Sequence, residues 1–228
     1  MQTGWQNING NWYYLNEDSS SSSYGALQDG WIQKQANDKD TKLYWFYLEE
    51  NESSSTYGAM WGGGWKQIGG RWYFFDNQHI GYYGALIQGK WVKTDGKWYY
   101  VRPEVPNHPE ESYMVTGLVD VPASESWPDK TSYPSGTYYF DNSGAWQAFH
   151  GWQKIGGNWY YFDSNSSAMK DAFINEGSNT YYLGPDGKML TGWQTIGSYE
   201  DYFDPGDGHA WKNADMDGQH LDASGHKV

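Results

Sequence analysis

One segment constrains the fold of this chain more than any other. It is residues 151–163, with the sequence GWQKIGGNWYYFD. Gly156-Gly157 is a two-residue turn signal between two alternating runs, which predicts a tight β-hairpin. The predicted cross-strand pairs are Ile155 with Asn158, Lys154 with Trp159, Gln153 with Tyr160, and Trp152 with Tyr161. Because paired residues share a face of the ribbon, Trp152, Trp159 and Tyr161 project to one side. An isolated hairpin is only marginally stable in water, so this one must pack against another element.

Most of the remaining chain consists of further copies of this hairpin. The copies start at positions 5, 31, 65, 91, 118, 152, 173 and 193, which are the Trp of each Gly-Trp pair or the residue in its place. The spacing between successive copies runs from 20 to 34 residues, which is the period range of solenoids and propellers. Each copy holds two short strands, too few for a four-stranded propeller blade. We therefore predict an all-β fold, a solenoid of stacked β-hairpins.

The copies divide the chain, which we expect to be a single repeat module over residues 1–228. The expected parts are four N-terminal repeats at 4–101, a proline-rich insertion with a degenerate repeat at 102–136, C-terminal repeats at 137–212, and a polar tail at 213–228. Six of the eight prolines lie in the insertion, and proline denies a strand its ladder donors. Gly117-Leu118 and Thr137 to Phe140 read as the two halves of the degenerate repeat.

Composition excludes several classes of protein. Aromatic residues make up 19% of the chain, with 15 Trp and 21 Tyr, so its core must be built from rings. There is no cysteine, which rules out disulfides, cysteine zinc sites and a cysteine nucleophile. No apolar run reaches the length of a membrane span. The net charge of −13 argues against a nucleic-acid partner. The start, MQTGWQ, lacks a signal peptide and suggests either a recombinant start or a mature chain cut from a longer one.

The motif GWxxxxGxWYY, followed by a short linker and Gly-Ala-Met or Gly-Ala-Leu, resembles the cell-wall-binding repeat of Gram-positive surface proteins. Within that family the chain is most similar to the choline-binding modules of pneumococcal-type surface proteins and autolysins. The resemblance covers about residues 4–212, apart from the insertion. It implies hairpins stacked in a left-handed β-superhelix, with choline held between consecutive hairpins in a cage of aromatic rings.

In this family two Trp of one repeat and a Tyr of the next form each cage. Carried over by position, the resemblance implies five choline sites: Trp5 and Trp12 with Tyr47; Trp31 and Trp45 with Phe74; Trp65 and Trp72 with Tyr100; Trp91 and Trp98 with Tyr139; and Trp152 and Trp159 with Tyr182. In each Tyr-Tyr pair we assign the second ring to the cage and the first to the core, on strand alternation. Copies five, seven and eight lack the Trp pair and are not expected to bind.

The chemistry of the ligand agrees with such cages. A quaternary ammonium donates no hydrogen bond, and the negative face of an aromatic ring attracts it, with Trp the strongest of the rings. At about 0.5–2 kcal/mol per ring, three rings hold one choline only in the millimolar range. Several cages on one polymer would supply the useful affinity through avidity.

The leading interpretation is therefore a non-catalytic module that binds choline or phosphocholine of teichoic and lipoteichoic acids and anchors a secreted protein to the bacterial cell wall. An α-glucan-binding repeat module is an alternative, although the second Trp of each copy favours choline. The targeting part of a cell-wall hydrolase is another, and an adhesin or an inhibitor that competes for choline is a fourth. No catalytic constellation stands out among the carboxylates. We expect no metal, no cofactor, no membrane span and no nucleic-acid partner.

Overall fold

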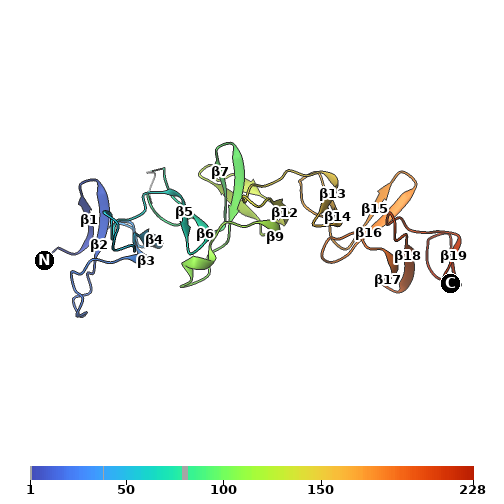
Figure 1. Ribbon diagram of the computed structural model, residues 1–228, viewed down its shortest axis with the longest axis horizontal. Coiled ribbons are helices and arrows are strands. Elements are labelled where there is room, and N and C mark those ends of the chain that lie inside the picture. Colours follow the sequence, from blue (N-terminus) through green and yellow to red (C-terminus); the bar gives the residue numbers. More distant parts are fainter. Residues whose placement is uncertain (1, 38, 79–81) are drawn as a thin grey trace. The chain divides into compact units, whose positions relative to one another are not determined.

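The computed structural model describes residues 2–37, 39–78 and 82–228. These residues form β-hairpins joined by connectors, with one short 3₁₀ helix, η1 (Pro109–Glu111) (Figure 1). The strands are β1 (Gly4–Ile8), β2 (Asn11–Leu15), β3 (Gly30–Gln35), β4 (Leu43–Leu48), β5 (Gly64–Ile68), β6 (Arg71–Phe75), β7 (Lys90–Thr94), β8 (Lys97–Val101), β9 (Gly117–Val121), β10 (Ser124–Trp127), β11 (Ser132–Tyr133), β12 (Gly136–Phe140), β13 (Gly151–Ile155), β14 (Asn158–Phe162), β15 (Ala172–Glu176), β16 (Asn179–Leu183), β17 (Gly192–Ile196), β18 (Tyr199–Phe203), β19 (Ala214–Met216) and β20 (Gln219–Leu221).

The predicted hairpin register is the observed one. In β13–β14, Trp152 pairs with Tyr161 and Lys154 with Trp159, as the turn chemistry requires. Gly156 and Gly157 have φ angles of 58° and 87°, so both central residues of the turn are left-handed. Such a turn matches the twist of the two strands, and glycine adopts it without a steric penalty. The all-β prediction and the hairpin solenoid are confirmed.

The chain forms two compact units. One unit comprises Met1–Thr116 and Ala123–Pro134, and the other comprises Gly117–Pro122 and Ser135–Val228. The hairpins β1–β2, β3–β4, β5–β6 and β7–β8 belong to the first unit. Strands β10 and β11 of the insertion also belong to the first unit. The second unit contains the pair of β9 with β12 and the four hairpins from β13 to β20.

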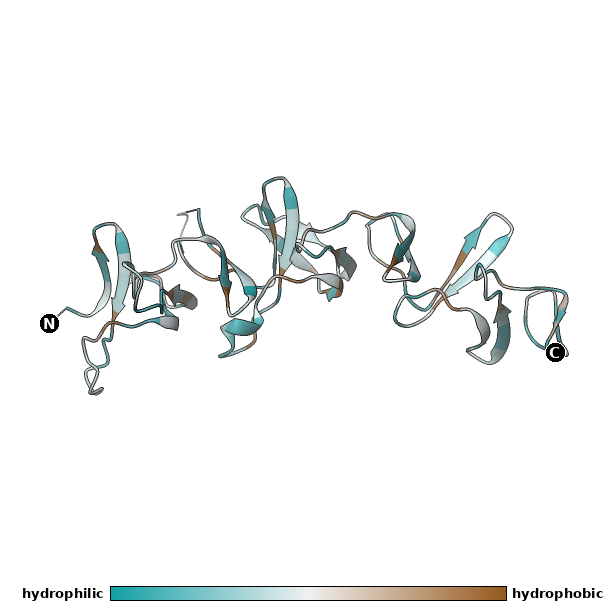
Figure 2. Ribbon diagram, in the orientation of Figure 1, coloured by the Kyte–Doolittle hydropathy of each residue, from teal (hydrophilic) through white to brown (hydrophobic). Residues whose placement is uncertain are grey.

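The core of each unit is formed by rings and by the last residue of each hairpin. Leu48, Phe75 and Val101 end their hairpins and are fully buried. Each of them also bridges to the connector that follows, for example Leu48 to Met60. Burying such a side chain stabilises a fold by about 1.5–3 kcal/mol. Figure 2 shows hydrophobic positions scattered over the hairpins rather than gathered in one region. The fully buried side chains are mostly Phe, Tyr and Leu contributed by successive hairpins.

Aspartates close the connectors of the second unit. Asp163 Oδ1 accepts hydrogen bonds from the amides of Asn165 and Ser167, and Asp222 Oδ1 accepts from those of Ser224 and His226. Asp141 and Asp204 occupy the equivalent place after their strands. These carboxylates serve turns, which is the role that Asp has after a strand end.

The insertion contains more order than its prolines predict. β9 pairs with β12, so the degenerate repeat exists, with Leu118 opposite Tyr139. Between these strands the chain forms β10 and β11. Strand β10 pairs in parallel with β7, which gives a four-stranded sheet in the order β11-β10-β7-β8.

The expected polar tail, residues 213–228, also differs from the prediction. It forms the hairpin β19–β20, closed by Asp217-Gly218 with φ angles of 52° and 76°. This turn has the same chemistry as the Asn9-Gly10 turn of the first hairpin. Among the residues that the structure describes, no helix has the length and hydropathy needed to cross a membrane.

Candidate functional site

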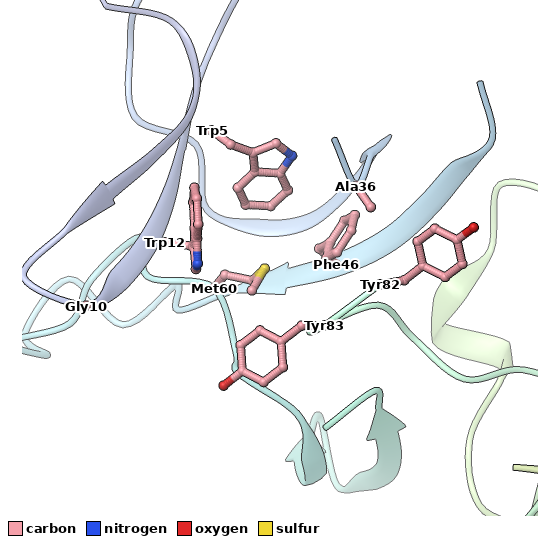
Figure 3. A pocket seen from close by; sticks show the side chains of 8 residues that line it. All are labelled: Trp5, Gly10, Trp12, Ala36, Phe46, Met60, Tyr82 and Tyr83. Atoms are coloured by element: carbon pink, nitrogen blue, oxygen red, sulfur yellow. The ribbon is translucent and has the colours of Figure 1, made fainter. Parts of the chain in front are cut away.

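A ring-lined cavity of about 360 Å³ lies between the first two hairpins (Figure 3). Its walls are Trp5, Gly10, Trp12, Ala36, Phe46, Met60, Tyr82 and Tyr83. Trp5 meets the ring of Phe46 edge-on, with the centroids 5.0 Å apart. Trp12 stands across the cavity from Phe46, and Met60 closes its floor in this view. The two Trp come from one hairpin, Phe46 from the next hairpin and Met60 from the connector after it.

The first Trp of a hairpin is oriented by a hydrogen bond to the hairpin that follows. Trp5 Nε1 donates to the carbonyl oxygen of Gln35 at 2.9 Å, and Trp152 Nε1 donates to Glu176 Oε2 at 2.9 Å. Trp65 makes the same kind of bond to the hydroxyl of Thr94. Each acceptor ends the first strand of the next hairpin. The indole N–H is thereby satisfied, and the ring is fixed with one face toward the gap between hairpins.

The second Trp of a hairpin keeps much of its ring in solvent. Trp12 is 40% exposed, Trp72 42% and Trp159 41%. A Trp that served only packing would be more deeply covered, and an exposed large ring costs solvation free energy at every repeat. The recurrence of nearly the same exposure in different hairpins indicates a surface kept open for a ligand.

The connectors complete these cavities. The amide of Met60 donates to the carbonyl of Trp12 at 2.7 Å, and the amide of Met189 donates to that of Trp159 at 2.8 Å. Leu86 and Met114 make the equivalent bonds to Trp45 and Trp72. One apolar side chain, often the polarisable thioether of Met, is therefore anchored beside the second Trp of the hairpin before it.

Four cages share two parts of this construction, a ring of the next hairpin beside the first Trp and an apolar connector residue bonded to the second Trp. Their members are, for the first cage, Trp5, Trp12, Phe46 and Met60; for the second cage, Trp31, Trp45, Tyr73 and Leu86; for the third cage, Trp65, Trp72, Tyr99 and Met114; and for the C-terminal cage, Trp152, Trp159, Tyr181 and Met189. The first three lie in the first unit and the last in the second unit.

In each of these cages the ring beside the first Trp stands one position before the ring expected from the sequence. Trp31 meets Tyr73 at 5.1 Å, Trp65 meets Tyr99 at 5.2 Å and Trp152 meets Tyr181 at 5.1 Å. The rings expected in those places pack instead against the first aromatic of their own hairpin: Tyr47 on Trp31, Phe74 on Trp65, Tyr100 on Trp91 and Tyr182 on Phe173.

Strand alternation explains the correction. Trp31 and Tyr47 are a cross-strand pair, so they share a face, and Phe46 lies on the opposite face. Hairpins stacked in one direction present the Trp face of one to the opposite face of the next. The first ring of each Tyr-Tyr pair therefore points back to the preceding Trp pair. The sequence pattern identifies the facing ring only when it is combined with the direction in which the hairpins stack.

The fourth Trp pair is occupied by the insertion. Tyr133 of β11 lies 5.3 Å from Trp91 and 5.4 Å from Trp98, and Trp91 is only 1% exposed. The predicted partner, Tyr139, belongs to the other unit and stacks on Phe149 at 5.5 Å. An internal ring therefore takes the place that the sequence analysis gave to a ring of the next repeat.

The degenerate copies lack the second Trp in space as well as in sequence. Leu118 packs in the cluster of Tyr160 and Phe162. Phe173 is 47% exposed, and Thr180 stands at the position of the second Trp in its hairpin. In the last of these copies Glu200 takes the place of the second Trp, and Lys227 makes the connector bond, amide to carbonyl, at 2.8 Å.

The hydroxyl of Tyr73, in the second cage, stays neutral. Burial, the largest cause, raises the pKa of the Tyr73 hydroxyl above its ordinary value of 10.0. The attraction that this ring offers a cation then comes from its face.

A cluster of possible metal ligands lies away from the cages. In the described part of the chain, Asp204, Asp207 and His209 have ligand atoms within 4.8 Å of one another. The carboxylates of Asp204 and Asp207 accept turn amides, and the ring of His209 pairs with Asp207 at 2.6 Å.

Two family profiles match the chain. The profile of a choline-binding repeat matches residues 149–191 and 177–214, and that of a cell wall binding repeat matches residues 3–18, 63–78 and 89–103. These segments contain three of the four cage Trp pairs. No curated protein sequence matches the chain.

Solved structures match over the whole chain. Choline binding protein F from Streptococcus pneumoniae, crystallised with a peptidoglycan analogue, is 23% identical, with 86% of its chain covered and a TM-score of 0.51. A second crystal form is 21% identical, with 92% covered and a TM-score of 0.46. The modular autolysin LytC from Streptococcus pneumoniae is 20% identical, with 48% of its chain covered and a TM-score of 0.46.

The first of these likenesses shows the fold, a set of stacked hairpins. The chain does not span every matched protein fully. It covers 59% of another choline binding protein F structure and about half of the autolysin. The motif, the hairpin register and both profiles agree. This chain therefore belongs to the family of proteins built from choline-binding, cell-wall-binding repeats.

Proposed function

We propose that this chain binds choline groups of teichoic and lipoteichoic acids and so attaches a surface protein to the bacterial cell wall. The observation that carries the proposal is the open cage. In the first cage, the half-exposed Trp12 faces Trp5 and Phe46 across a cavity of about 360 Å³, a volume that admits a small organic cation.

The cage suits a quaternary ammonium better than a primary one. Its walls are ring faces and the thioether of Met60, and the indole N–H of Trp5 is already used by the carbonyl of Gln35. A trimethylammonium group needs no hydrogen-bond acceptor, whereas a primary ammonium would lose water contacts without replacement. Choline is the wall component with this chemistry.

Four cages permit multivalent attachment. Each cage holds one choline weakly, because three rings and one Met or Leu side chain supply only a few kcal/mol. A polymer that carries several choline groups can engage the three cages of the first unit together. Avidity then exceeds the affinity of one cage by orders of magnitude.

The direct test is calorimetry on the purified chain. Titration with choline should give binding with a stoichiometry of more than one, and titration with isomaltose oligomers should give none. Retention on a tertiary-amine resin with elution by free choline would agree with that result. Binding of the sugar alone would mean that the repeats recognise an α-glucan.

We propose in addition that the chain is a binding module without wall-degrading activity. No profile of a catalytic domain is among the family matches, and β-hairpins of the repeat type extend from β1 to β20. Incubation with purified choline-containing walls should release no soluble sugar or peptide. Release that is abolished by Glu110→Gln, at the carboxylate that pairs with His108, would contradict this proposal.

A further inference from the structure

A second hollow in the first unit runs beside the cages. It measures about 620 Å³. Among the residues that line it, Tyr82 also lines the cavity of the first cage, and Trp45 and Leu86 belong to the second cage. The far wall is Glu125 to Pro128 of the insertion, together with Lys130. We refer to this hollow as the insertion groove. It connects the rims of two adjacent cages.

Aromatic rings form much of its surface. Tyr44 and Tyr82 stack on each other with centroids 4.1 Å apart, and Tyr82 keeps 37% of its surface exposed. On the insertion side Trp127 is held edge-on against the buried Phe74, with centroids 5.3 Å apart. Rings supported from behind in this way present rigid flat faces. The apolar face of a pyranose ring packs well against such a surface.

The charge of the groove differs from that of the chain as a whole. Three lysines line it, Lys42, Lys90 and Lys130, although the chain carries a net charge of −13. Lys90 pairs with Glu125 at 2.9 Å. Among the described residues, Lys42 and Lys130 form no ion pair. Both are exposed at the groove, so they offer two ammonium groups to an anionic ligand.

Three carboxylates also line the groove, those of Asp76, Glu104 and Glu125, and of these Glu104 is exposed. Asp76 is 5% exposed, and its Oδ1 accepts the amide of Gln78 within a turn. Glu125 is engaged by Lys90. An anion placed beside Lys42 and Lys130 would meet two exposed ammonium groups, in a groove with as many lysines as carboxylates and in a chain with a net charge of −13.

We propose that the insertion groove holds the sugar–phosphate backbone of the wall polymer between two choline groups seated in the first and second cages. The proposal rests on the proposed function, since the cages must hold choline. Sugar rings would lie against Tyr82 and Trp127, and phosphodiester oxygens would accept hydrogen bonds from Lys42 and Lys130. The insertion thus supplies a polymer contact that no repeat by itself contains.

The test compares two probes on the whole chain. One probe is free choline, and the other is a phosphodiester-linked oligosaccharide that carries two phosphocholine groups. In the double variant Lys42→Ala/Lys130→Ala, the affinity for the oligosaccharide should fall about tenfold, because two charge-assisted hydrogen bonds are lost. The affinity for free choline should not change. Added salt should weaken oligosaccharide binding less in the variant than in the wild type.

A charge-matched control is Lys39→Ala/Lys97→Ala, which removes two exposed lysines that do not line the groove. It should bind both probes like the wild type. An equal loss of oligosaccharide affinity in both double variants would show that only net charge matters, and it would overturn the groove proposal. Unchanged oligosaccharide affinity in both would overturn it as well. Absence of free-choline binding in the wild type would overturn the proposed function itself.

Discussion

The Nζ atom of Lys227 lies 2.6 Å from Glu200 Oε2 and 5.8 Å from the ring centroid of Trp193. Glu200 occupies the position of the second Trp in its hairpin, and Lys227 occupies the position that Met60 has in the first cage. A carboxylate and a Trp face thus hold a cation between hairpins, and that cation belongs to the chain itself. Lys227 therefore fills the last gap of the second unit, the one between the hairpins β17–β18 and β19–β20.

This arrangement predicts that the last gap can be converted into a cage. The triple variant Glu200→Trp/Gln219→Tyr/Lys227→Met restores the second Trp, the ring of the next hairpin and the thioether. Gln219 is the correct position because its pairing with Met216 matches that of Tyr13 with Gln6. Calorimetry should show one additional bound choline. The double variant that retains Lys227 is the control, and it should not gain a site because its own ammonium competes.

Adjacent tyrosines give a sharp test of the corrected cage. Tyr181 faces Trp152, whereas Tyr182 faces Phe173, and both are partly exposed. Tyr181→Ala should remove the choline held by Trp152 and Trp159, at a cost of about 0.5–2 kcal/mol in that site. Tyr182→Ala should leave it in place. Titration of the two variants distinguishes them, and a loss confined to Tyr182→Ala would restore the original assignment.

The two pairs Trp65–Trp72 and Trp91–Trp98 should behave differently although their sequences match. Trp72→Ala should reduce the number of bound cholines by one, because Trp72 is 42% exposed in the third cage. Trp98→Ala should leave the number unchanged, because Tyr133 already lies 5.4 Å from its ring. Equal losses in both variants would show that Tyr133 does not close the fourth site.

Acid should weaken the connectors of the second unit. Backbone amides, the largest cause in both cases, hold the pKa of Asp204 and of Asp222 below the ordinary value of 3.8. A lowered pKa in the folded state stabilises the fold fully above that ordinary value, and the contribution is lost as the pH falls through the lower one. The midpoint temperature should therefore drop on acidification to about pH 2.5.

Asparagine separates the charge from the hydrogen bond. Asp204→Asn/Asp222→Asn keeps an acceptor for the turn amides but has no proton to gain. Its midpoint temperature, followed by circular dichroism, should fall less between neutral and acidic pH than that of the wild type. Asp95→Asn, in a hairpin turn of the first unit, is the control and should follow the wild type.

Much of the fold could be predicted from the chain because its turns are explicit. Asn9-Gly10 and Gly156-Gly157 determine where each hairpin reverses, and the register then follows by counting. The Trp pairs were found for the same reason. The choice between Tyr181 and Tyr182 could not be made by counting within one hairpin, since it depends on which face the next hairpin presents.

Other features depend on contacts remote in sequence. Tyr133 reaches Trp91 only because β10 pairs in parallel with β7, and proline-rich surroundings give no signal of that pairing. Lys227 pairs with Glu200 because residues between them form the β19–β20 hairpin. The polar composition of that segment gave no indication of a hairpin. Tyr82 lines two cavities, which is a property of packing rather than of local sequence pattern.

The bond from the Met60 amide to the Trp12 carbonyl means that no cage belongs to one repeat. Each cage is a joint between a hairpin, its successor and the connector after that successor. A gene duplication that copied one hairpin alone would add strands without adding a joint. A new binding site therefore requires duplication of a hairpin together with the connector that follows it. A cut within that connector would remove the site formed by the second Trp of the preceding hairpin.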